Sequence, residues 1–495
     1  MPTLDAMFRR ACRWRGAAEF LVDPGLRVSG RAAAAHAGEA AAALAALGVR
    51  PGDVVAFLCR SSVRHALAYF GALGAGAVVC NLHVRETPAA LADTVAWLGA
   101  RLVIADADLE DGRAALARAA PVIALDDARL ARGAPVAPPA RRGPDDLAAI
   151  VLSSGSTGRP KGVMHSHRTL LATAQAGQQL YAQITPHDTA VVTMAASFAA
   201  WAHVVLPYVA AGAKVVFAGA FDPAAFLHTL AAERVTMAPL VPTMWRRVLA
   251  QDFGAADLGA VRVASISGEP PARGELEGIQ TRVCRRICAL YLASEGGNAA
   301  GTLATDEDLL ARGKTATSGK PVAGADLRIV DPAGGIDAEL PAGEVGEIAV
   351  TGASLALGYW RDEALTRARF VDGWWRSGDL GRLDADGDLF VEGRIDNLIN
   401  SGGIKVHAEE VERALLAHPR VALAAVVGVP DPTWGQRIEA HVVPRDDALT
   451  AAEVVEFCRA ALAAFKVPRV VHLCGELPLG PTGKLFRPGL RAPRE

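Results

Sequence analysis

Several features that would point to a membrane, secreted or nucleic-acid-binding protein are missing from this chain of 495 residues. No uninterrupted apolar run reaches the roughly 20 residues that a membrane-spanning helix needs. The arginines at the start, from Arg9 to Arg15, are not followed by the apolar core and cleavage site of a secretory signal. The formal net charge is only −2, so no basic field attracts nucleic acid or anionic lipid. We therefore expect a cytoplasmic protein whose partners are small molecules, with no nucleic acid and no membrane span.

Cysteine and dinucleotide signatures are also sparse. Seven cysteines, an odd number, are scattered from Cys12 to Cys474, which favours a reducing compartment over a disulfide framework. Cys284 and Cys288 stand too alone to form a metal site, and we expect them to be packing residues. No G-x-G-x-x-G segment opens a helix after an early strand, so a dinucleotide-dependent oxidoreductase is a poor fit.

The length and the order of predicted elements indicate an α/β protein with more than one domain. A chain of 495 residues exceeds one ordinary core, so two or more domains are expected. A predicted helix over 32–47 is followed by a predicted strand over 54–58 and a second helix over 65–73. Such alternation implies parallel strands joined by helical crossovers.

The most informative stretch runs from residue 152 to residue 162, between a predicted buried strand over 147–152 and a predicted helix over 169–180. Its glycines let backbone N–H groups approach an anion, its hydroxyls can donate to phosphate oxygens, and its lysine supplies a positive charge. The pattern differs from a P-loop because Pro160 stands where Gly-Lys is needed, and a flexible surface turn is the alternative. The predicted polyphosphate clamp comprises Ser153, Ser154, Gly155, Ser156, Thr157, Gly158 and Lys161.

This stretch resembles the phosphate loop of the adenylate-forming superfamily, which includes acyl-CoA synthetases, adenylation domains of peptide synthetases and beetle luciferases. Residues 343–350 and 358–360 continue the resemblance, which covers nearly the whole chain. It implies a large N-terminal domain over 1–395, with mostly parallel sheets flanked by helices and a small β-barrel-like subdomain. It also implies a small mobile domain over 396–495, where the sequence pattern itself predicts a compact α+β module.

Two further segments resemble the superfamily's nucleotide site. The turn made by Gly268, Glu269 and Pro270 is implied to line the adenine pocket. Residues 291–297 resemble the Tyr-Gly-x-Thr-Glu motif, in which Tyr291 suits the adenine ring and the Ser294 hydroxyl the α-phosphate. A carboxylate among phosphates is useful only with a cation between them, so Glu295 is the expected Mg²⁺ contact. A solvated turn carboxylate is the alternative for Glu295.

The acyl pocket is implied by the same resemblance. Phe198, counted back from Gly212, occupies the position of the aromatic or histidine that gates the carboxylate substrate, although a core aromatic is an equal alternative. Leu292 replaces the usual glycine beside the acyl tunnel, which predicts a short, medium or compact aromatic acid. The predicted pocket comprises Phe198, Trp201, Gly268, Leu292 and Gly297.

The remaining assignments also come from the resemblance. Asp379 is expected to accept the ribose hydroxyls, with a turn aspartate as the alternative, and Arg394 to contact the ribose or phosphate. Asp396 occupies the hinge of the mobile domain. Lys484, in a loop rich in Gly and Pro, is expected to bring the substrate carboxylate and α-phosphate together. The path of coenzyme A is assigned to Ser401, Gly402 and Gly403.

The implied reaction has two halves. A carboxylate attacks the α-phosphorus of Mg-ATP and releases pyrophosphate, and then a thiol attacks the acyl-adenylate and releases AMP. A free-standing enzyme acting on coenzyme A is the first interpretation, because no condensation, carrier or reductase module is present in the sequence. A ligase that loads a separate carrier protein is the second. A non-catalytic paralogue that senses nucleotide is an alternative of another class.

Overall fold

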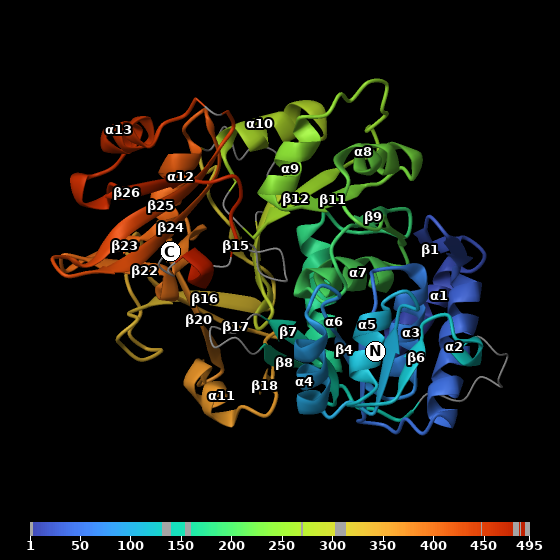
Figure 1. Cartoon of the computed structure of the whole chain (residues 1–495). Coiled ribbons are helices and arrows are strands. Elements are labelled where there is room, and N and C mark those ends of the chain that lie inside the picture. The colour runs from blue at the N-terminus through green and yellow to red at the C-terminus, as the bar shows by residue number, and fades with distance from the viewer. Residues whose placement is uncertain are drawn as a thin grey trace. The chain divides into compact units, whose positions relative to one another are not determined.

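The computed structural model of this chain describes residues 3–130, 140–153, 160–268, 271–301, 313–446, 448–478, 485 and 487–490 (Figure 1). The chain divides into two compact units. Unit 1 contains residues 1–327 and 350–375, and unit 2 contains residues 328–349 and 376–495. The chain passes between the units within three strands, β16 (Ala325–Val330), β17 (Gly346–Gly352) and β20 (Trp374–Leu383). The predicted domain boundary at residue 396 stays a prediction.

Unit 1 contains two large mixed sheets. The nine-stranded sheet has the order β15-β14-β13-β12-β11-β9-β10-β1-β2, and the seven-stranded sheet has the order β18-β8-β7-β4-β3-β5-β6. The first consists of β1 (Glu19–Asp23), β2 (Leu26–Ser29), β9 (Thr189–Val192), β10 (Lys214–Phe217), β11 (Met237–Leu240), β12 (Val263–Ser267), β13 (Ile287–Ala293), β14 (Gly297–Gly301) and β15 (Lys320–Pro321). The second consists of β3 (Val54–Leu58), β4 (Val78–Asn81), β5 (Leu102–Ala105), β6 (Val122–Ala124), β7 (Leu147–Ser153), β8 (Lys161–Ser166) and β18 (Gly358–Tyr359).

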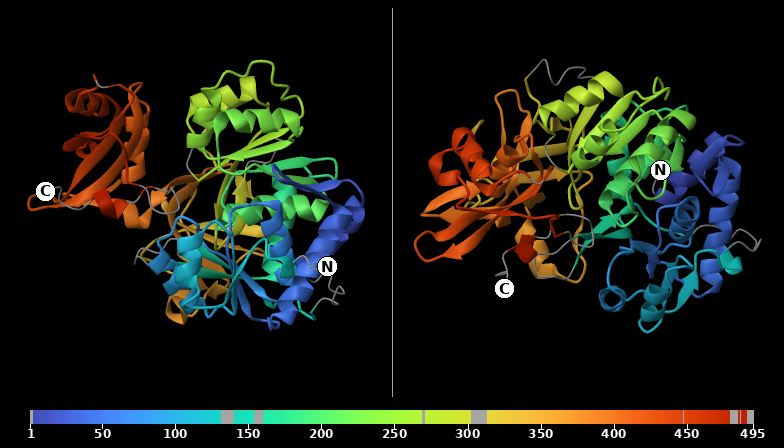
Figure 2. Two further views of the ribbon diagram at one scale, coloured as in Figure 1. Left: turned by 45° about the vertical axis from the view of Figure 1, so that its right-hand side comes forward. Right: turned by 45° about the horizontal axis from the view of Figure 1, so that its top comes forward.

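The central strands of both sheets pair in parallel, as the alternation of strands and helices predicts. Helices flank the sheets (Figure 2). They are α1 (Leu4–Arg15), α2 (Gly30–Ala46), α3 (Val63–Gly74), α4 (Pro88–Leu98), α5 (Glu110–Leu116), η1 (Ala128–Leu130), α6 (His167–Leu180), α7 (Ala199–Ala211), α8 (Pro223–Ala232), α9 (Pro242–Leu249), α10 (Arg273–Arg282) and α11 (Glu363–Arg369). The short strand β19 (Phe370–Val371) follows α11. The α/β prediction is confirmed.

Helix starts follow from local chemistry. The side chains of Ser29, Ser62 and Ser166 each accept a hydrogen bond from a backbone N–H in the first turn of α2, α3 and α6. Such capping satisfies a donor that has no partner inside the helix. These caps explain where α2, α3 and α6 begin.

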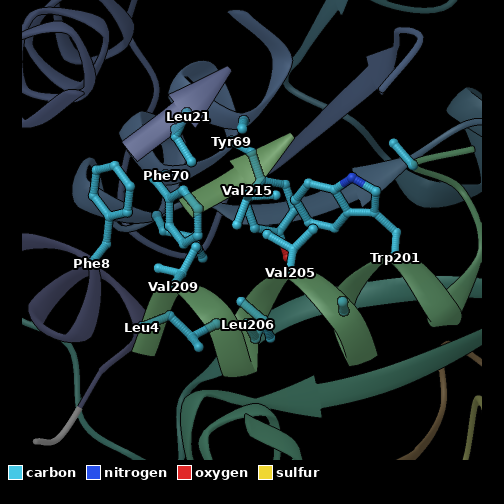
Figure 3. Packing of buried hydrophobic residues seen from close by; sticks show 14 of the residues in the cluster. Leu4, Phe8, Leu21, Tyr69, Phe70, Trp201, Val205, Leu206, Val209 and Val215 are labelled. Atoms are coloured by element: carbon cyan, nitrogen blue, oxygen red, sulfur yellow. The ribbon is translucent and has the colours of Figure 1, made fainter. Parts of the chain in front are cut away.

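Helix α7 lies at the centre of the largest apolar core. Nearly all of its side chains are buried, and those of Trp201, Val205 and Val209 pack with residues of other elements (Figure 3). Burial of such side chains contributes about 1.5–3 kcal/mol each relative to exposure. Cys288 belongs to this core and Cys284 to a second one, as expected for packing residues. None of the described helices has the length and apolar character that crossing a membrane requires.

Unit 2 contains a sheet with the order β23-β22-β25-β24, to which β26 adds in parallel beside β25. This is the predicted α+β module. After β21 (Leu389–Arg394), its elements are η2 (Ile395–Asn397), β22 (Leu398–Ser401), β23 (Ile404–His407), α12 (Ala408–Leu416), β24 (Val421–Asp431), β25 (Gly435–Pro444), α13 (Ala451–Ala461), η3 (Ala464–Lys466), β26 (Val470–Leu473) and η4 (Arg487–Leu490). The implied β-barrel-like subdomain stays a prediction.

Candidate active site

The predicted phosphate clamp connects two neighbouring strands of unit 1. Ser153 ends β7, Lys161 begins β8, and the two residues are antiparallel partners. Ser154, Gly155, Ser156, Thr157 and Gly158 lie outside the described residues. From Lys161, the last clamp residue, the chain continues as β8 before α6 begins, whereas the sequence predicts a helix as the next element. Val163 and His165 are buried in this strand, which pairs with β7 on one side and β18 on the other.

Close packing surrounds the first residues of β8. A Cβ atom at Gly162 would lie 2.9 Å from Ile150 and 2.9 Å from Trp97, so a larger residue would displace these side chains. Tyr359 pairs with Val163 across the β8–β18 register. Lys161 Nζ lies 5.8 Å from the centroid of the Tyr359 ring, which is cation–π range.

Glu295 lies in the turn between β13 and β14. Its Oε1 atom accepts a hydrogen bond from the Tyr359 hydroxyl at 3.0 Å. Trp375 Nε1 donates to the same hydroxyl oxygen at 3.3 Å. Burial, followed by the charge of Glu295, raises the pKa of Tyr359, so the phenol stays protonated at neutral pH and donates to the carboxylate. Tyr359 thus contacts both Lys161 and Glu295, which are 134 residues apart in sequence.

His165 also hydrogen-bonds to the turn that contains Glu295. Its Nε2 atom is 2.7 Å from the main-chain carbonyl oxygen of Ser294, and its Nδ1 atom is 3.1 Å from Thr169 Oγ1. Burial lowers the pKa of His165 to about 4, so the ring is neutral at pH 7 and donates through Nε2. Sequence reasoning missed His165, because a lone histidine in an alternating strand carries no local signal.

The residues of the predicted acyl pocket all lie in unit 1, in or directly beside α7, β12, β13 and β14. Phe198 is half-buried and immediately precedes α7, and Leu292 is half-buried in β13 opposite Asn298. Trp201 is 1% exposed and its Nε1 atom donates to Ser61 Oγ at 2.9 Å, so its described contacts are those of a core aromatic.

Two glycines of the predicted pocket have positive φ angles. Gly268 has φ +92° where β12 ends, and Gly297 has φ +67° at the start of β14. A Cβ atom at Gly297 would lie 2.8 Å from Ser354 Cβ and 2.9 Å from Thr173 Oγ1, so the backbone approaches these side chains closely. Tyr291 is 7% exposed in β13. Glu269 and Pro270 lie outside the described residues.

Asp379 and Arg394 are partners within unit 2. They face each other across the antiparallel β20–β21 pair, and Arg394 Nη1 lies 3.0 Å from Asp379 Oδ1. The Arg394 side chain is 50% exposed, whereas that of Asp379 is 16% exposed. Both residues are predicted from the sequence as nucleotide contacts. Their pairing in the β20–β21 register explains why their side chains form an ion pair.

The residues predicted for the hinge and for the coenzyme A path come directly after Arg394 in the sequence. Asp396 lies in η2, between β21 and β22. Ser401 ends β22, and Gly402 and Gly403 have φ +62° and +80° in the turn to β23. Gly402 N donates to the carbonyl oxygen of Trp434 at 2.7 Å. Lys484 lies outside the described residues.

Among the described residues of unit 2, two groups of side chains have the spacing to hold a metal ion. One is Glu439, His441 and His472, and the other is Asp384, Asp386 and Asp388. In the first, Glu439 already accepts from Arg437 Nε at 2.6 Å and lies 2.8 Å from His472 Nε2. In the second, Asp384 Oδ1 accepts from the backbone N–H groups of the two following aspartates at 3.0 and 2.9 Å, which is turn chemistry.

Comparison with known proteins identifies the family of the chain. The AMP-binding enzyme family matches residues 8–360, and its C-terminal domain matches residues 410–484. A feruloyl-CoA synthase from Amycolatopsis sp. is 34% identical over 454 residues, with 90% of each chain covered. A 2-succinylbenzoate–CoA ligase from Bacillus licheniformis is 30% identical over 457 residues, covering 91% of this chain and 92% of the ligase. The crystal structure of ATP-bound MatB from Rhodopseudomonas palustris is 27% identical, with a TM-score of 0.90 over 99% of this chain and 98% of that one.

Proposed function

This chain belongs to the AMP-binding enzyme family, and from that premise we propose how its residues activate a carboxylic acid with ATP and transfer it to coenzyme A. In the first half-reaction, a carboxylate oxygen bonds to the α-phosphorus and pyrophosphate leaves. A carboxylate is already ionised near pH 7, so no side chain has to act as base or nucleophile. Catalysis therefore consists of positioning and charge neutralisation.

The observation that carries the proposal is the shared contact of Lys161 and Glu295 with Tyr359. Through this contact, a cation and a carboxylate from distant segments of unit 1 both approach one side chain. Lys161, with the hydroxyls of Ser156 and Thr157, is proposed to bind the phosphates that leave. The Ser294 hydroxyl is proposed to bind the α-phosphate.

Glu295 is proposed to hold Mg²⁺. Its carboxylate fits this ion, which takes oxygen ligands and is commonly bound by one or two carboxylates together with substrate phosphates. When bound, the ion would neutralise charge on the phosphate oxygens. The Tyr359 hydroxyl orients the carboxylate for this purpose, because it occupies Oε1 as a donor.

The remaining nucleotide contacts are proposed from the resemblance. Gly268, Glu269, Pro270 and Tyr291 border the adenine, and Asp379 accepts the ribose hydroxyls. Arg394 contacts the nucleotide, and its ion pair with Asp379 supports a joint role. Lys484 brings the carboxylate and the α-phosphate together and is withdrawn for the second half, when the C-terminal domain rotates about Asp396.

Coenzyme A is the proposed thiol, approaching through Ser401, Gly402 and Gly403. Trp434, whose main-chain carbonyl oxygen accepts from Gly402 N, is 39% exposed, and the Arg469 guanidinium lies 4.1 Å from the Trp434 ring centroid. An exposed aromatic ring beside an arginine suits the adenine and phosphates of coenzyme A. A carrier protein presents the pantetheine arm without that adenine, so these residues favour coenzyme A over the carrier.

The proposed acid is short, medium-length or compact aromatic, because Leu292 occupies volume beside the predicted acyl tunnel. Screening pyrophosphate release over short, medium, branched, aromatic and C16 acids tests the proposal, with thioester formation then measured on coenzyme A and on a phosphopantetheinylated carrier. We expect turnover of a small acid and transfer to coenzyme A. A best kcat/KM on the C16 acid contradicts the size assignment, and no pyrophosphate from any acid favours the nucleotide sensor. The cytoplasmic location stays a prediction.

A further inference from the structure

The loop before α7 and the segment just after β4 each carry one buried polar atom that has no hydrogen-bond partner among the described residues. These atoms are Ser197 Oγ and His83 Nε2. Each of the two residues is only 7% exposed. Most buried polar groups in folded proteins are hydrogen-bonded, because leaving one unsatisfied is costly. Each atom therefore keeps a hydrogen-bonding position that no described residue fills.

Both residues are neighbours of Phe198, His83 in space and Ser197 in sequence. The His83 ring lies 5.4 Å from the Phe198 ring, at an interplanar angle of 65°, and Ser197 directly precedes Phe198. Asn81 fixes this arrangement. Its Nδ2 atom donates to the carbonyl oxygen of Ala196 at 3.0 Å, and its Oδ1 atom lies 2.8 Å from His65 Nε2. The loop that carries the predicted gate is therefore held against the end of β4.

His83 presents a donor rather than an acceptor. Its Nδ1 atom accepts from the backbone N–H of Arg85 at 3.3 Å, so a neutral ring carries its proton on Nε2. Burial, followed by the charge of Arg85, lowers the pKa of His83 and keeps the ring neutral at pH 7. The Ser197 hydroxyl likewise has a proton available to donate.

We propose that His83 Nε2–H and Ser197 Oγ–H form a polar subsite beside Phe198. This subsite binds an acceptor oxygen of the acid or of coenzyme A, and that oxygen is not part of the carboxylate that reacts. The inference rests on the proposed function and on the gating role of Phe198. Two reactants offer such an oxygen. One is an acid that carries an ether, hydroxyl, carbonyl or second carboxylate group, and the other is coenzyme A, through the amide carbonyls of its pantetheine arm. An unsubstituted hydrocarbon acid offers none.

The test compares acids of matched size with and without an ether oxygen, on the full-length protein. Methoxyacetate is paired with butyrate, and 4-methoxycinnamate with 4-ethylcinnamate. The variant His83→Phe keeps a ring against Phe198 and removes the donor, and Ser197→Ala removes the hydroxyl. The control is His228→Phe, an exposed position on α8. Melting temperatures establish whether each variant is folded. If His83→Phe is unfolded, the kinetics of Ser197→Ala test the subsite instead.

Pyrophosphate release reports the first half-reaction. Thioester formation from a supplied acyl-adenylate reports the second, with coenzyme A and with 2-mercaptoethanol, which has no amide carbonyl. If the acid supplies the oxygen, His83→Phe lowers kcat/KM about 10-fold for the oxygenated acid and spares its partner. If the pantetheine arm supplies the oxygen, His83→Phe lowers the rate of thioester formation about 10-fold with coenzyme A but not with 2-mercaptoethanol, and pyrophosphate release is unchanged.

Unchanged kinetics in both halves for both variants overturns the subsite, as does an equal loss with every acid and thiol. The proposed function fails separately, when the wild type releases no pyrophosphate with any acid. In that case, saturation-transfer NMR of the acid pairs and coenzyme A with the wild type and His83→Phe decides the subsite. A signal that depends on the oxygen and weakens in the variant supports it, and signals indifferent to both contradict it.

Discussion

The Tyr359 hydroxyl donates to Glu295 Oε1 at 3.0 Å, and this bond joins the β18 strand to the turn after β13. Because Tyr359 also receives a hydrogen bond from Trp375 Nε1 and faces Lys161, it is the positioning residue of the proposed phosphate and metal site. Its phenol is held protonated by burial and by the adjacent carboxylate, so its direction of donation is fixed.

Tyr359→Phe removes the donor while keeping the ring under Lys161. We expect the kcat/KM of pyrophosphate release to fall about 10-fold, since a hydrogen bond to a charged group is lost. The Mg²⁺ concentration needed for half-maximal activity should rise, and thioester formation from a supplied acyl-adenylate should stay near the wild-type rate. The control is Thr351→Val, which removes an exposed hydroxyl that donates to Gly373 O at 2.7 Å. An unchanged Mg²⁺ dependence would show that Tyr359 does not position Glu295.

Lys484→Ala should separate the two half-reactions. The lysine is proposed to offset repulsion between the carboxylate and the α-phosphate, so adenylate formation should fall about 100-fold or more. Transfer from a supplied acyl-adenylate to coenzyme A should be nearly intact. Arg459→Ala, which removes a positive charge on α13, serves as the control. Equal losses in both halves would contradict this division of labour.

Asp396→Pro should have the opposite effect. Proline fixes φ and stiffens the proposed hinge, so the first half-reaction should survive while the second slows about 10-fold. Asp396→Ala is the matched control, because it removes the same carboxylate and leaves the backbone free to rotate. If both substitutions act alike, the carboxylate rather than the backbone matters, and the hinge assignment is wrong.

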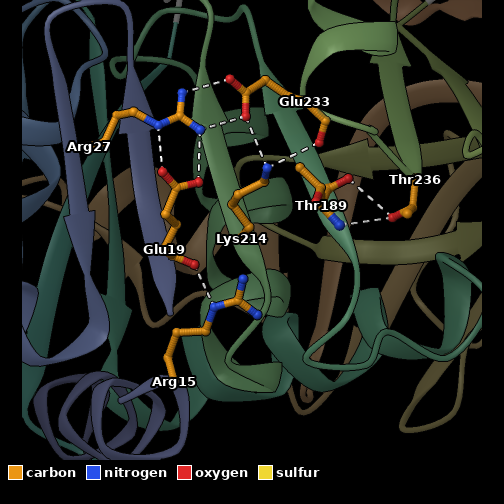
Figure 4. Close-up of polar contacts among 7 residues, drawn as sticks. All are labelled: Arg15, Glu19, Arg27, Thr189, Lys214, Glu233 and Thr236. Carbon is orange, nitrogen blue, oxygen red and sulfur yellow. Dashed lines mark hydrogen bonds and ion pairs between the residues drawn. The ribbon is translucent and has the colours of Figure 1, made fainter. Parts of the chain in front are cut away.

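A charged network at one edge of the nine-stranded sheet provides a test of stability. Glu233 binds Arg27 Nη1 at 2.7 Å and Lys214 Nζ at 3.0 Å, and Arg27 also binds Glu19 (Figure 4). Hydrogen bonding from Arg27, despite opposing burial and with help from Lys214, lowers the pKa of Glu233 to about 2. A lowered folded-state pKa means that this stabilisation is present above the unfolded pKa and is lost as pH falls toward 2.

Glu233→Gln should therefore lower the free energy of unfolding by about 1 kcal/mol at pH 7. The difference from the wild type should shrink as pH falls from about 4.5 toward 2. Thermal or urea unfolding across this range measures it, with Glu363→Gln on α11, whose side chain is 90% exposed, as the control. A gap that stays constant with pH would exclude ionisation of Glu233 as its cause.

The sequence predicts local elements better than the contacts among them. Strand β10 is observed over the predicted residues 214–217, since a short apolar run before a helix leaves few alternatives. Strand β8 was missed because Pro160 and Gly162 suggest a loop, whereas the strand depends on pairing with β7 and β18. The bond between Tyr359 and Glu295 spans 64 residues, and that between His165 and Ser294 spans 129, so neither has a local signal.

The central claim is that a carboxylate oxygen of the acid bonds to the α-phosphorus of ATP. The most direct measurement is turnover of an acid labelled with ¹⁸O in both carboxylate oxygens, followed by mass spectrometry of the nucleotide. The account predicts one ¹⁸O atom in each AMP and one in each acyl-CoA, because the oxygen that bonds to phosphorus leaves with AMP. Unlabelled AMP, or ADP and phosphate as products, would contradict it.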